Sequence, residues 1–347
     1  LTGLPNRALL EERLNQALQR RREFDKPACL LLLNLDQFSQ INELHGHAMG
    51  DQVLIEVARR LEHLDATLSL GRLGADTFAV LYALDVNQMP TQAQQLNQRL
   101  AQAWSYGGQT LSFRCSQGWA SLEPSFNASE VLRDADLALR IAKRQQRGSW
   151  QGFDPQMQQQ MRKRVTLESE LRAAIADNTP IEAFYQPIID LHQARVAGFE
   201  ALVRWRHSDG KLVSPADFIP LAEETGLVVD LGRIMLERGT AALAQWYARS
   251  PWPMTIAINV AGAQLEGEEL EPLVTALLQQ HQLTAGALKL EVTESMLMQH
   301  PQRIAERLQR LINLGTQVSL DDFGTGYSSL AYLHNFPCHT LKVDKSF

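Results

Sequence analysis

Residues 318–329 read VSLDDFGTGYSS, and the second half of the chain is organised around this stretch. A short apolar run, typical of a buried strand, ends in Asp321 and Asp322, and a glycine-rich polar loop follows at once. Neighbouring strand residues point to opposite faces, so both acids can serve one site only where the strand is ending. Two adjacent carboxylates also need a cation or a basic partner. A capped turn is the plainer interpretation of a single Asp-Asp pair, but the pattern recurs along the chain.

Five short apolar strands share this pattern, and each delivers a polar or charged residue at or near its end. They are predicted at residues 196–200, 255–259, 288–291, 318–321 and 340–342. Helical patterns lie between them, at residues 216–224, 232–247, 270–281 and 302–314. Strand-helix units at this spacing predict a parallel β/α succession, and functional groups at successive strand ends predict a TIM-type β/α barrel.

The strand ends supply a set of oxygen ligands. They are Glu200, Asn259, Glu291, Asp321 and Asp322. No cysteine or clustered histidine joins them, which favours Mg²⁺ or Mn²⁺ over zinc. Two ions bridged by Asp321 are expected to activate a water molecule and to neutralise a phosphodiester. Lys342, one strand along, adds positive charge for the nucleophile or the developing phosphorane, and a salt bridge to the acids is a compatible alternative.

The first half of the chain predicts a separate domain of the α/β or α+β class, because helices and strands alternate. Helices are expected at residues 11–22, 38–60, 91–103 and 129–144, strands at 28–36 and 111–120, and a hairpin at 69–81. The helical pattern at 38–60 is interrupted at residues 46–51. Asn34 and Asp36 lie two residues apart on the first strand and therefore share one of its faces.

Composition limits the classes of function. A length of 347 residues, an apolar share of 45% and a net charge of −6 fit two globular domains and argue against binding of a nucleic acid polymer. Three cysteines without CxxC spacing indicate a reducing, cytoplasmic compartment. The opening LTGLPNR has no initiator methionine, so we expect a longer parent protein with N-terminal sensory domains. A membrane anchor in that parent and a homodimer are both compatible with this view.

The first module, residues 1–154, resembles the GGDEF domain, the diguanylate cyclase fold. The matching pieces are LTGLPNR, NLDQFSQINELHGHAMGD, RLGADTF and ADLALRIAK. The resemblance implies a cyclase-palm-like α+β fold. Its signature is eroded, since the family has Gly-Gly-Asp/Glu-Glu-Phe where this chain has Gly74, Ala75, Asp76, Thr77 and Phe78.

Further departures from the GGDEF pattern imply a domain without cyclase activity. Asn34 stands where the family carries a metal-binding acid, and Ala75 adds a β-carbon where a phosphate must approach the backbone. The family's inhibitory-site Arg and Asp are replaced by Asp65 and Leu68, and Ser39 stands where a lysine is usual. Lys143 and Arg147 fit the basic pair that the family uses near GTP phosphates, and a solvated helix end remains the alternative. The module is then at most a GTP-responsive regulator.

Residues 155–166 are expected to connect the modules as part of a helix over residues 156–175. Its apolar residues Met157, Met161, Val165, Leu171 and Ile175 lie near one stripe. The helix can carry motion between modules, or its stripe can simply be a docking surface.

The second module, residues 167–347, resembles the EAL domain, the cyclic di-GMP phosphodiesterase family. The matches are YQPI at 185–188, EALVRW at 200–205, FIPLAE at 218–223, EVTES at 291–295, DDFGTGYSS at 321–329 and KVDKSF at 342–347. The triplet Asp-Phe-Gly at 322–324 is also a motif of protein kinases. That interpretation is excluded, because no glycine-rich nucleotide loop or His-Arg-Asp sequence accompanies the triplet.

The EAL resemblance implies a role for each matched residue. Glu200, Asn259, Glu291 and Asp321 are implied to hold a first metal ion, and Asp321 and Asp322 a second. Gln186, Leu202 and Arg204 are implied to contact the dinucleotide, Glu294 to anchor the loop 322–329, and Asp344 to lie near the substrate. Ala261 departs from the family's frequent serine. The module is shorter than the roughly 250 residues that such a barrel usually needs, so a further metal-binding glutamate and a substrate glutamine are expected beyond Phe347.

The sequence therefore favours metal-dependent hydrolysis of cyclic di-GMP to linear pGpG. The alternative is a receptor that binds cyclic di-GMP through the second module without cleaving it. A working cyclase is disfavoured by Asn34 and Thr77.

Overall fold

The computed structural model describes residues 1–347 except 250–251, 295, 297–300, 325–335 and 345–347, and the side chain of Asp322 also lies outside the described part. The chain forms two compact units, Leu1–Arg162 and Lys163–Phe347. In the described residues, no helix is both long and apolar enough to cross a membrane.

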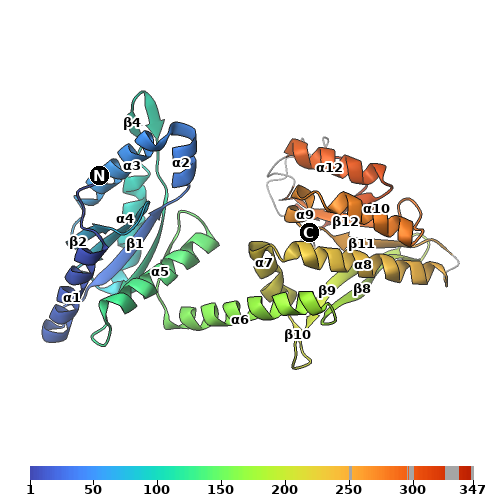
Figure 1. Ribbon diagram of the computed structural model, residues 1–347, viewed down its shortest axis with the longest axis horizontal. Coiled ribbons are helices and arrows are strands. Elements are labelled where there is room, and N and C mark those ends of the chain that lie inside the picture. Colours follow the sequence, from blue (N-terminus) through green and yellow to red (C-terminus); the bar gives the residue numbers. More distant parts are fainter. Residues whose placement is uncertain (250–251, 295, 297–300, 325–335, 345–347) are drawn as a thin grey trace. The chain divides into compact units, whose positions relative to one another are not determined.

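The first unit is a five-stranded sheet in the order β2-β3-β1-β6-β7 with helices on both faces (Figure 1). The strands are β1 (Cys29–Leu35), β2 (Thr67–Arg72), β3 (Thr77–Tyr82), β6 (Cys115–Ser121) and β7 (Trp150–Gly152). The helical segments are α1 (Arg7–Phe24), α2 (Phe38–His45), α3 (His47–Leu61), η1 (Val86–Gln88), α4 (Met89–Leu100) and α5 (Ala128–Gln145).

The apolar run of β1 explains this layering. Leu31 and Leu33 pack into a core with α3 and α4, whereas Leu30 and Leu32 pack into another with α1 and α5. A strand buried on both faces needs apolar residues at every position rather than at alternate ones. The continuous leucine run therefore places β1 at the centre of the sheet, between β3 and β6.

The predicted interruption of the helix at 38–60 is present: α2 ends at His45 and α3 begins at His47, with Gly46 between them at a φ of 82° that suits glycine. The break is shorter than predicted, because residues 47–51 belong to α3. A second prediction for this unit is corrected. The strand expected at 111–120 is two strands, because β5 (Gln109–Leu111) turns back on β4 (Trp104–Tyr106) and β6 begins only at Cys115. Phe113 lies between them with its side chain buried.

The second unit has a sheet in the order β10-β9-β11-β12-β13-β14, with β8 paired to β9. The strands are β8 (Ile181–Asp190), β9 (Arg195–Arg206), β10 (Leu212–Val213), β11 (Thr255–Asn259), β12 (Leu288–Thr293), β13 (Gln317–Phe323) and β14 (Thr340–Val343). The helices include α7 (Pro215–Thr225), α8 (Val228–Tyr247), α9 (Gly262–Glu266), α10 (Leu270–Gln280) and α12 (Pro301–Asn313). Helix α6 (Pro155–Asp177) runs into this unit from the first.

Strands β9, β11, β12, β13 and β14 are parallel, and their pairing follows chain order. Helices α8, α10 and α12 pack against one face of this sheet, as residues such as Leu236, Val274 and Leu308 share a core with it. This is the strand-helix succession of a TIM-type β/α barrel, as predicted. The five predicted strands are all present.

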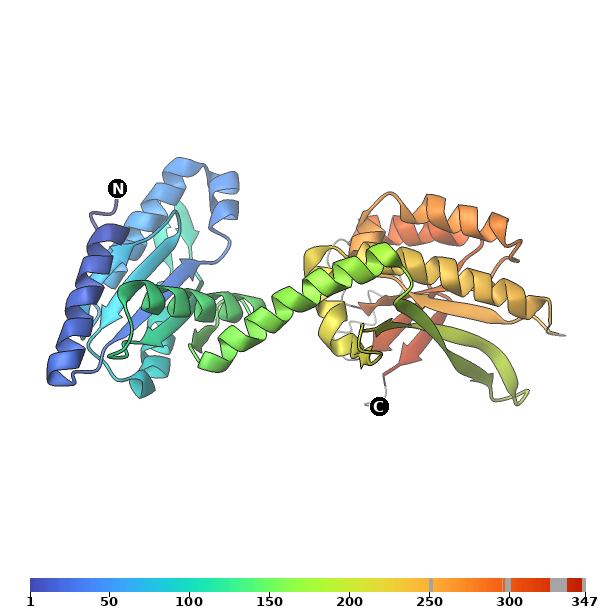
Figure 2. The same cartoon turned by 60° about the horizontal axis from the view of Figure 1, so that its bottom comes forward.

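The antiparallel hairpin of β8 and β9 was not predicted (Figure 2). Strand β9 does not end at Glu200 as expected but continues to Arg206, because its second half pairs with β8 and β10. Pro187 lies within β8, which is tolerated because β8 pairs with β9 on one side only among the described strands.

Helix α6 contributes Leu171 and Ile175 to a core that also contains Trp205 and Phe218. The side chain of Val165, by contrast, is exposed. The predicted apolar stripe is therefore interrupted, and its C-terminal part is a docking surface within the second unit.

Candidate functional site

The alternation of strand residues places the predicted ligands on the face of the second sheet that the helices do not cover. On β9, Phe199 and Ala201 pack toward the helices, so Glu200 points to the opposite face. On β12, Leu290 and Val292 also pack toward the helices, so Glu291 points to the opposite face. On β13, Leu320 packs toward the helices, so Asp321 points to the opposite face. Because the strands are parallel, these side chains meet on one side of the sheet.

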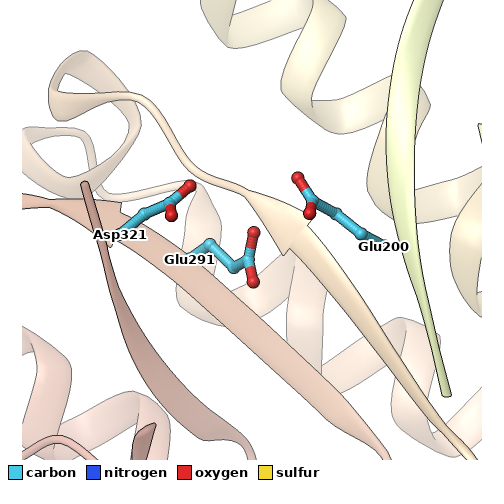
Figure 3. A group of neighbouring side chains, drawn as sticks. All are labelled: Glu200, Glu291 and Asp321. Carbon is cyan, nitrogen blue, oxygen red and sulfur yellow. The ribbon is translucent and has the colours of Figure 1, made fainter. Parts of the chain in front are cut away.

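Glu200, Glu291 and Asp321 form a compact acid cluster, with one carboxylate oxygen from each lying within 4.8 Å of the others. Figure 3 shows the three carboxylates facing one another from three strands of this sheet, β9, β12 and β13. Asn259 joins the cluster by donating a hydrogen bond from Nδ2 to Glu200 Oε1 at 3.1 Å. This bond leaves its amide oxygen as a further ligand for a cation.

Lys342 on β14 is hydrogen-bonded to all three acids. Its Nζ lies 2.8 Å from Glu291 Oε2, 3.1 Å from Glu200 Oε2 and 3.2 Å from Asp321 Oδ2. The predicted salt bridge is therefore present, and it fixes the spacing of the carboxylates. With all three carboxylates ionised, the one ammonium group leaves two negative charges, which one divalent cation would neutralise.

Burial dominates the electrostatics of the cluster. The Glu291 side chain is only 2% exposed, and burial raises its pKa to about 7, helped by the charges of Glu200 and Asp321 and opposed by Lys342. Burial alone would lower the pKa of Lys342, but its hydrogen bonds and charge interactions with Glu291 and Glu200 outweigh this and raise it. A hard cation fits this donor set, because it is made of carboxylate and amide oxygens.

The predicted site of the first unit, at the end of β1 and the start of β3, has a different set of polar groups. Asn34 of β1 and Thr77 of β3 lie directly opposite each other, and Asn34 Nδ2 donates to Thr77 Oγ1 at 2.9 Å. Thr77 Oγ1 in turn donates to Asp76 Oδ1 at 3.4 Å. Asp36 Oδ1 accepts from Ser116, while its Oδ2 is buried without a hydrogen-bond partner among the described residues. The Asn34–Thr77 pair therefore offers a divalent cation only an amide and a hydroxyl, which are weaker ligands than carboxylates.

The predicted basic pair lies in the same place. A pocket of about 440 Å³ is lined by Asn34, Ala75, Asp76, Lys143 and Arg147, among other residues. The structure thus brings the end of α5 close to the end of β1 and the start of β3. Gly74 and Phe78 belong to the β2–β3 hairpin at this place, and Phe78 is fully buried. Whether this pocket accepts GTP remains a prediction.

Comparison with known families decides the affiliation of the chain. The model of the EAL domain matches residues 168–347, just over half of the chain. The chain belongs to the EAL family. A second model, for the diguanylate cyclase GGDEF domain, matches residues 1–149, so a GGDEF domain precedes the EAL domain as the sequence predicted.

Relatives share this tandem arrangement along the whole chain. MucR of Pseudomonas aeruginosa, a bifunctional diguanylate cyclase/cyclic di-GMP phosphodiesterase, is 35% identical over 100% of this chain and 51% of its own length. NbdA of the same organism, a cyclic di-GMP phosphodiesterase, is 37% identical over 100% of this chain and 45% of its own length. The chain therefore spans about half the length of these curated relatives.

A solved structure has the same fold. The GGDEF-EAL portion of LapD from Vibrio cholerae, bound to c-di-GMP, superposes with a TM-score of 0.57. The match covers 99% of this chain and 80% of the other, at 18% identity. It confirms the predicted cyclase-like GGDEF fold followed by a TIM-type EAL barrel.

The residues predicted to contact the dinucleotide lie beside the acid cluster of the EAL domain. Leu202 and Arg204 follow Glu200 on the same face of β9 and line a pocket of about 310 Å³, which Asn259 and Glu291 also line. Gln186 of β8 is the exposed register partner of Glu200. The structure thus places these residues together, and their roles remain predictions.

Other predicted site residues are less completely described. The side chain of Asp322 and residues 325–335 lie outside the described residues, as does most of the loop that Glu294 is predicted to anchor. Glu294 itself is buried at the end of β12. Asp344 follows β14 and is partly exposed.

Sequence reasoning missed two residues next to this site. Phe184 of β8 lies beneath the Arg204 guanidinium, with 5.6 Å between the guanidinium carbon and the ring centroid, and it would have been found had β8 been predicted. Gln264 of α9 lines the pocket of about 310 Å³ from a buried position. The sequence signal for Gln264 was its position three residues after Ala261, because a capping box has glutamine or glutamate at that spacing from the N-cap residue.

Proposed function

We propose that the EAL domain hydrolyses cyclic di-GMP to linear pGpG in a reaction that requires Mg²⁺ or Mn²⁺. The observation that carries this proposal is the convergence of Glu200, Glu291 and Asp321 within 4.8 Å, with Lys342 bonded to all three. The names of MucR and NbdA support the same activity.

The roles of the residues follow from their positions. Glu200, Asn259, Glu291 and Asp321 would hold a divalent cation, with Asp321 and Asp322 as ligands of a second. A bound cation supplies Lewis acidity that polarises a phosphoryl oxygen and lowers the pKa of a water molecule. Hydrolysis adds that water across one P–O bond, so the product carries one 5′-phosphate and one free 3′-hydroxyl.

The chain's own side chains would align the substrate for this step. Arg204 and Leu202 line the pocket, and Phe184 lies beneath the Arg204 guanidinium group. Lys342 keeps positive charge within the acid cluster, where charge develops on the phosphate. Holding the phosphodiester against fixed charges is the main contribution that a protein makes to phosphoryl transfer.

We further propose that the GGDEF domain makes no cyclic di-GMP and acts as a nucleotide-responsive regulator. The neutral Asn34–Thr77 bond is the observation that favours this. Regulation by GTP must be reciprocal, so GTP and cyclic di-GMP must change each other's affinity by the same factor.

The decisive experiment separates an enzyme from a receptor. Purified protein is incubated with cyclic di-GMP in Mg²⁺, Mn²⁺, Ca²⁺ or EDTA, and nucleotides are separated chromatographically. We expect pGpG in Mg²⁺ and Mn²⁺ and none in EDTA. Ca²⁺ is expected to fail because its longer, irregular coordination positions water and phosphate poorly. Binding of cyclic di-GMP without pGpG in any metal would establish the receptor instead, and full activity in Ca²⁺ would refute the metal assignment.

A further inference from the structure

Gln264 holds the turn between β11 and α9 in the EAL domain from a buried position. Its side-chain Oε1 accepts a hydrogen bond from the backbone N–H of Ala261 at 3.0 Å, and its own backbone N–H donates to Ala261 O at 3.0 Å. The residue is 5% exposed. Both polar groups of Ala261 are therefore bonded to Gln264.

The residue at the start of α9 explains why this contact matters. Ala261 is the N-cap residue, and its methyl group accepts no hydrogen bond. Serine, threonine, aspartate or asparagine at such a position would bond to the first turn through its own side chain. With alanine there, side-chain fixation of the turn depends on Gln264.

Helix α8 leaves a notch for the Gln264 side chain at Gly232. A β-carbon at Gly232 would lie 2.1 Å from Gln264 Nε2, 2.2 Å from Oε1 and 2.4 Å from Cδ. Contacts below 3.0 Å are essentially never made by real β-carbons. The amide of Gln264 is thus set against the backbone of α8, which fixes its position.

The fixed turn lies two residues beyond Asn259. Val260 N donates to Glu291 O at 2.9 Å on one side of the turn, and the Gln264–Ala261 pair closes the other side. The Asn259 side chain is exposed, so burial does not set its rotamer. Its orientation depends on the backbone that carries it and on the 3.1 Å bond to Glu200.

We infer that Gln264, seated against Gly232, is a positioning residue that aims the Asn259 amide oxygen at the divalent cation. This inference rests on the proposed function, because it presupposes that a cation binds at the acid cluster. Gln264 does not touch the cation and acts only through Asn259. Residues that orient metal ligands in this way typically change metal affinity about 10–100-fold when they are replaced.

The test measures Mn²⁺ binding by electron paramagnetic resonance without nucleotide. We expect Gln264→Leu to weaken Mn²⁺ binding about tenfold. Gln264→Glu keeps an acceptor for the Ala261 N–H and should stay within about threefold of the unmodified protein. A thermal melt of each variant checks folding, and Gln264→Asn, which withdraws the acceptor by one methylene, replaces the leucine variant should that one not fold.

A double-mutant cycle distinguishes positioning from a general effect on structure. In an Asn259→Ala background, Gln264→Leu should cause no further loss of Mn²⁺ affinity, because its action passes through Asn259. An additive loss, or unchanged affinity in Gln264→Leu alone, overturns the inference while the proposed function stands. Mn²⁺ binding that does not respond to Glu200→Gln overturns both.

Discussion

Both domains carry polar side chains on the strands of their sheets, but these side chains find their hydrogen-bond and charge partners in different ways. In the GGDEF domain, the facing residues Asn34 and Thr77 bond directly to each other at 2.9 Å. In the EAL domain, Glu200, Glu291 and Asp321 converge and share one lysine. The Asn34–Thr77 pair is neutral and bonded without a cation, whereas the EAL cluster retains negative charge that calls for one.

The GGDEF pocket combines this neutral pair with charged residues. Lys143 and Arg147 line it together with Asn34, Asp36 and Asp76. Like charges that face each other across two strands are destabilising unless something lies between them. A neutral hydrogen-bonded pair removes that need at the positions of Asn34 and Thr77.

The largest expected effect comes from removing one carboxylate in each domain. Glu200→Gln takes away a cation ligand and an acceptor for Lys342, so pGpG formation should fall by more than about 100-fold in initial-rate measurements. Asp76→Asn, the matched change in the GGDEF domain, should leave the rate within about twofold. A loss below tenfold in Glu200→Gln, about 1.4 kcal/mol, would contradict the ligand assignment.

Much of this contrast could be predicted from the sequence, because it depends on local patterns. The leucine run of β1 predicted a buried strand, and five apolar runs with polar ends predicted the parallel strands of the EAL domain. Asn34 and Thr77 stood out as neutral residues at positions where the resemblance called for acids.

What the sequence did not predict depends on pairing between distant segments. Strand β8 was missed because Pro187 argues against a strand unless that strand lies at an edge. Strand β13 was expected to end at Asp321 but continues to Phe323, and its pairing with β14 shifts register between Leu320 and Phe323. Such an irregularity re-aims side chains and leaves no local signal. The closure of the Ala261 turn by Gln264 likewise depends on Gly232, far away in sequence.

An intermediate effect is expected from restoring charge to the GGDEF domain. Asn34→Asp with Thr77→Glu puts two acids directly opposite each other and removes the 2.9 Å bond. Asn34 is 7% exposed, so we expect a loss of about 1–3 kcal/mol without divalent cations. This corresponds to a decrease of several degrees in the melting temperature, and millimolar Mg²⁺ or Mn²⁺ should reverse most of it.

A matched control exists in the same domain. Ser105 and Thr110 are also register partners joined by a hydrogen bond of 2.9 Å, but on the exposed β4–β5 hairpin. Ser105→Asp with Thr110→Glu should change the melting temperature little, because solvent screens the new charges. Should the Asn34/Thr77 variant melt alike with and without Mg²⁺, the view that a neutral pair has replaced a cation would be wrong.

The smallest expected effect concerns nucleotide binding by the GGDEF pocket. If the site holds no cation, as we propose, the phosphates of GTP would be met by Lys143 and Arg147, so GTP affinity should be as high in EDTA as in Mg²⁺. Lys143→Ala or Arg147→Ala should each weaken GTP binding by roughly three- to tenfold in calorimetric titrations, about one charge-assisted hydrogen bond. Arg140→Ala is the control, since Arg140 lies on the same helix but is paired with Asp136.

GTP binding that requires Mg²⁺ would mean that Asp36 and Asp76 still hold a cation, and the contrast between the two domains would then be one of degree. Equal affinity in EDTA, lost only in the Lys143 and Arg147 variants, would show that the GGDEF domain has kept its phosphate contacts while giving up its metal.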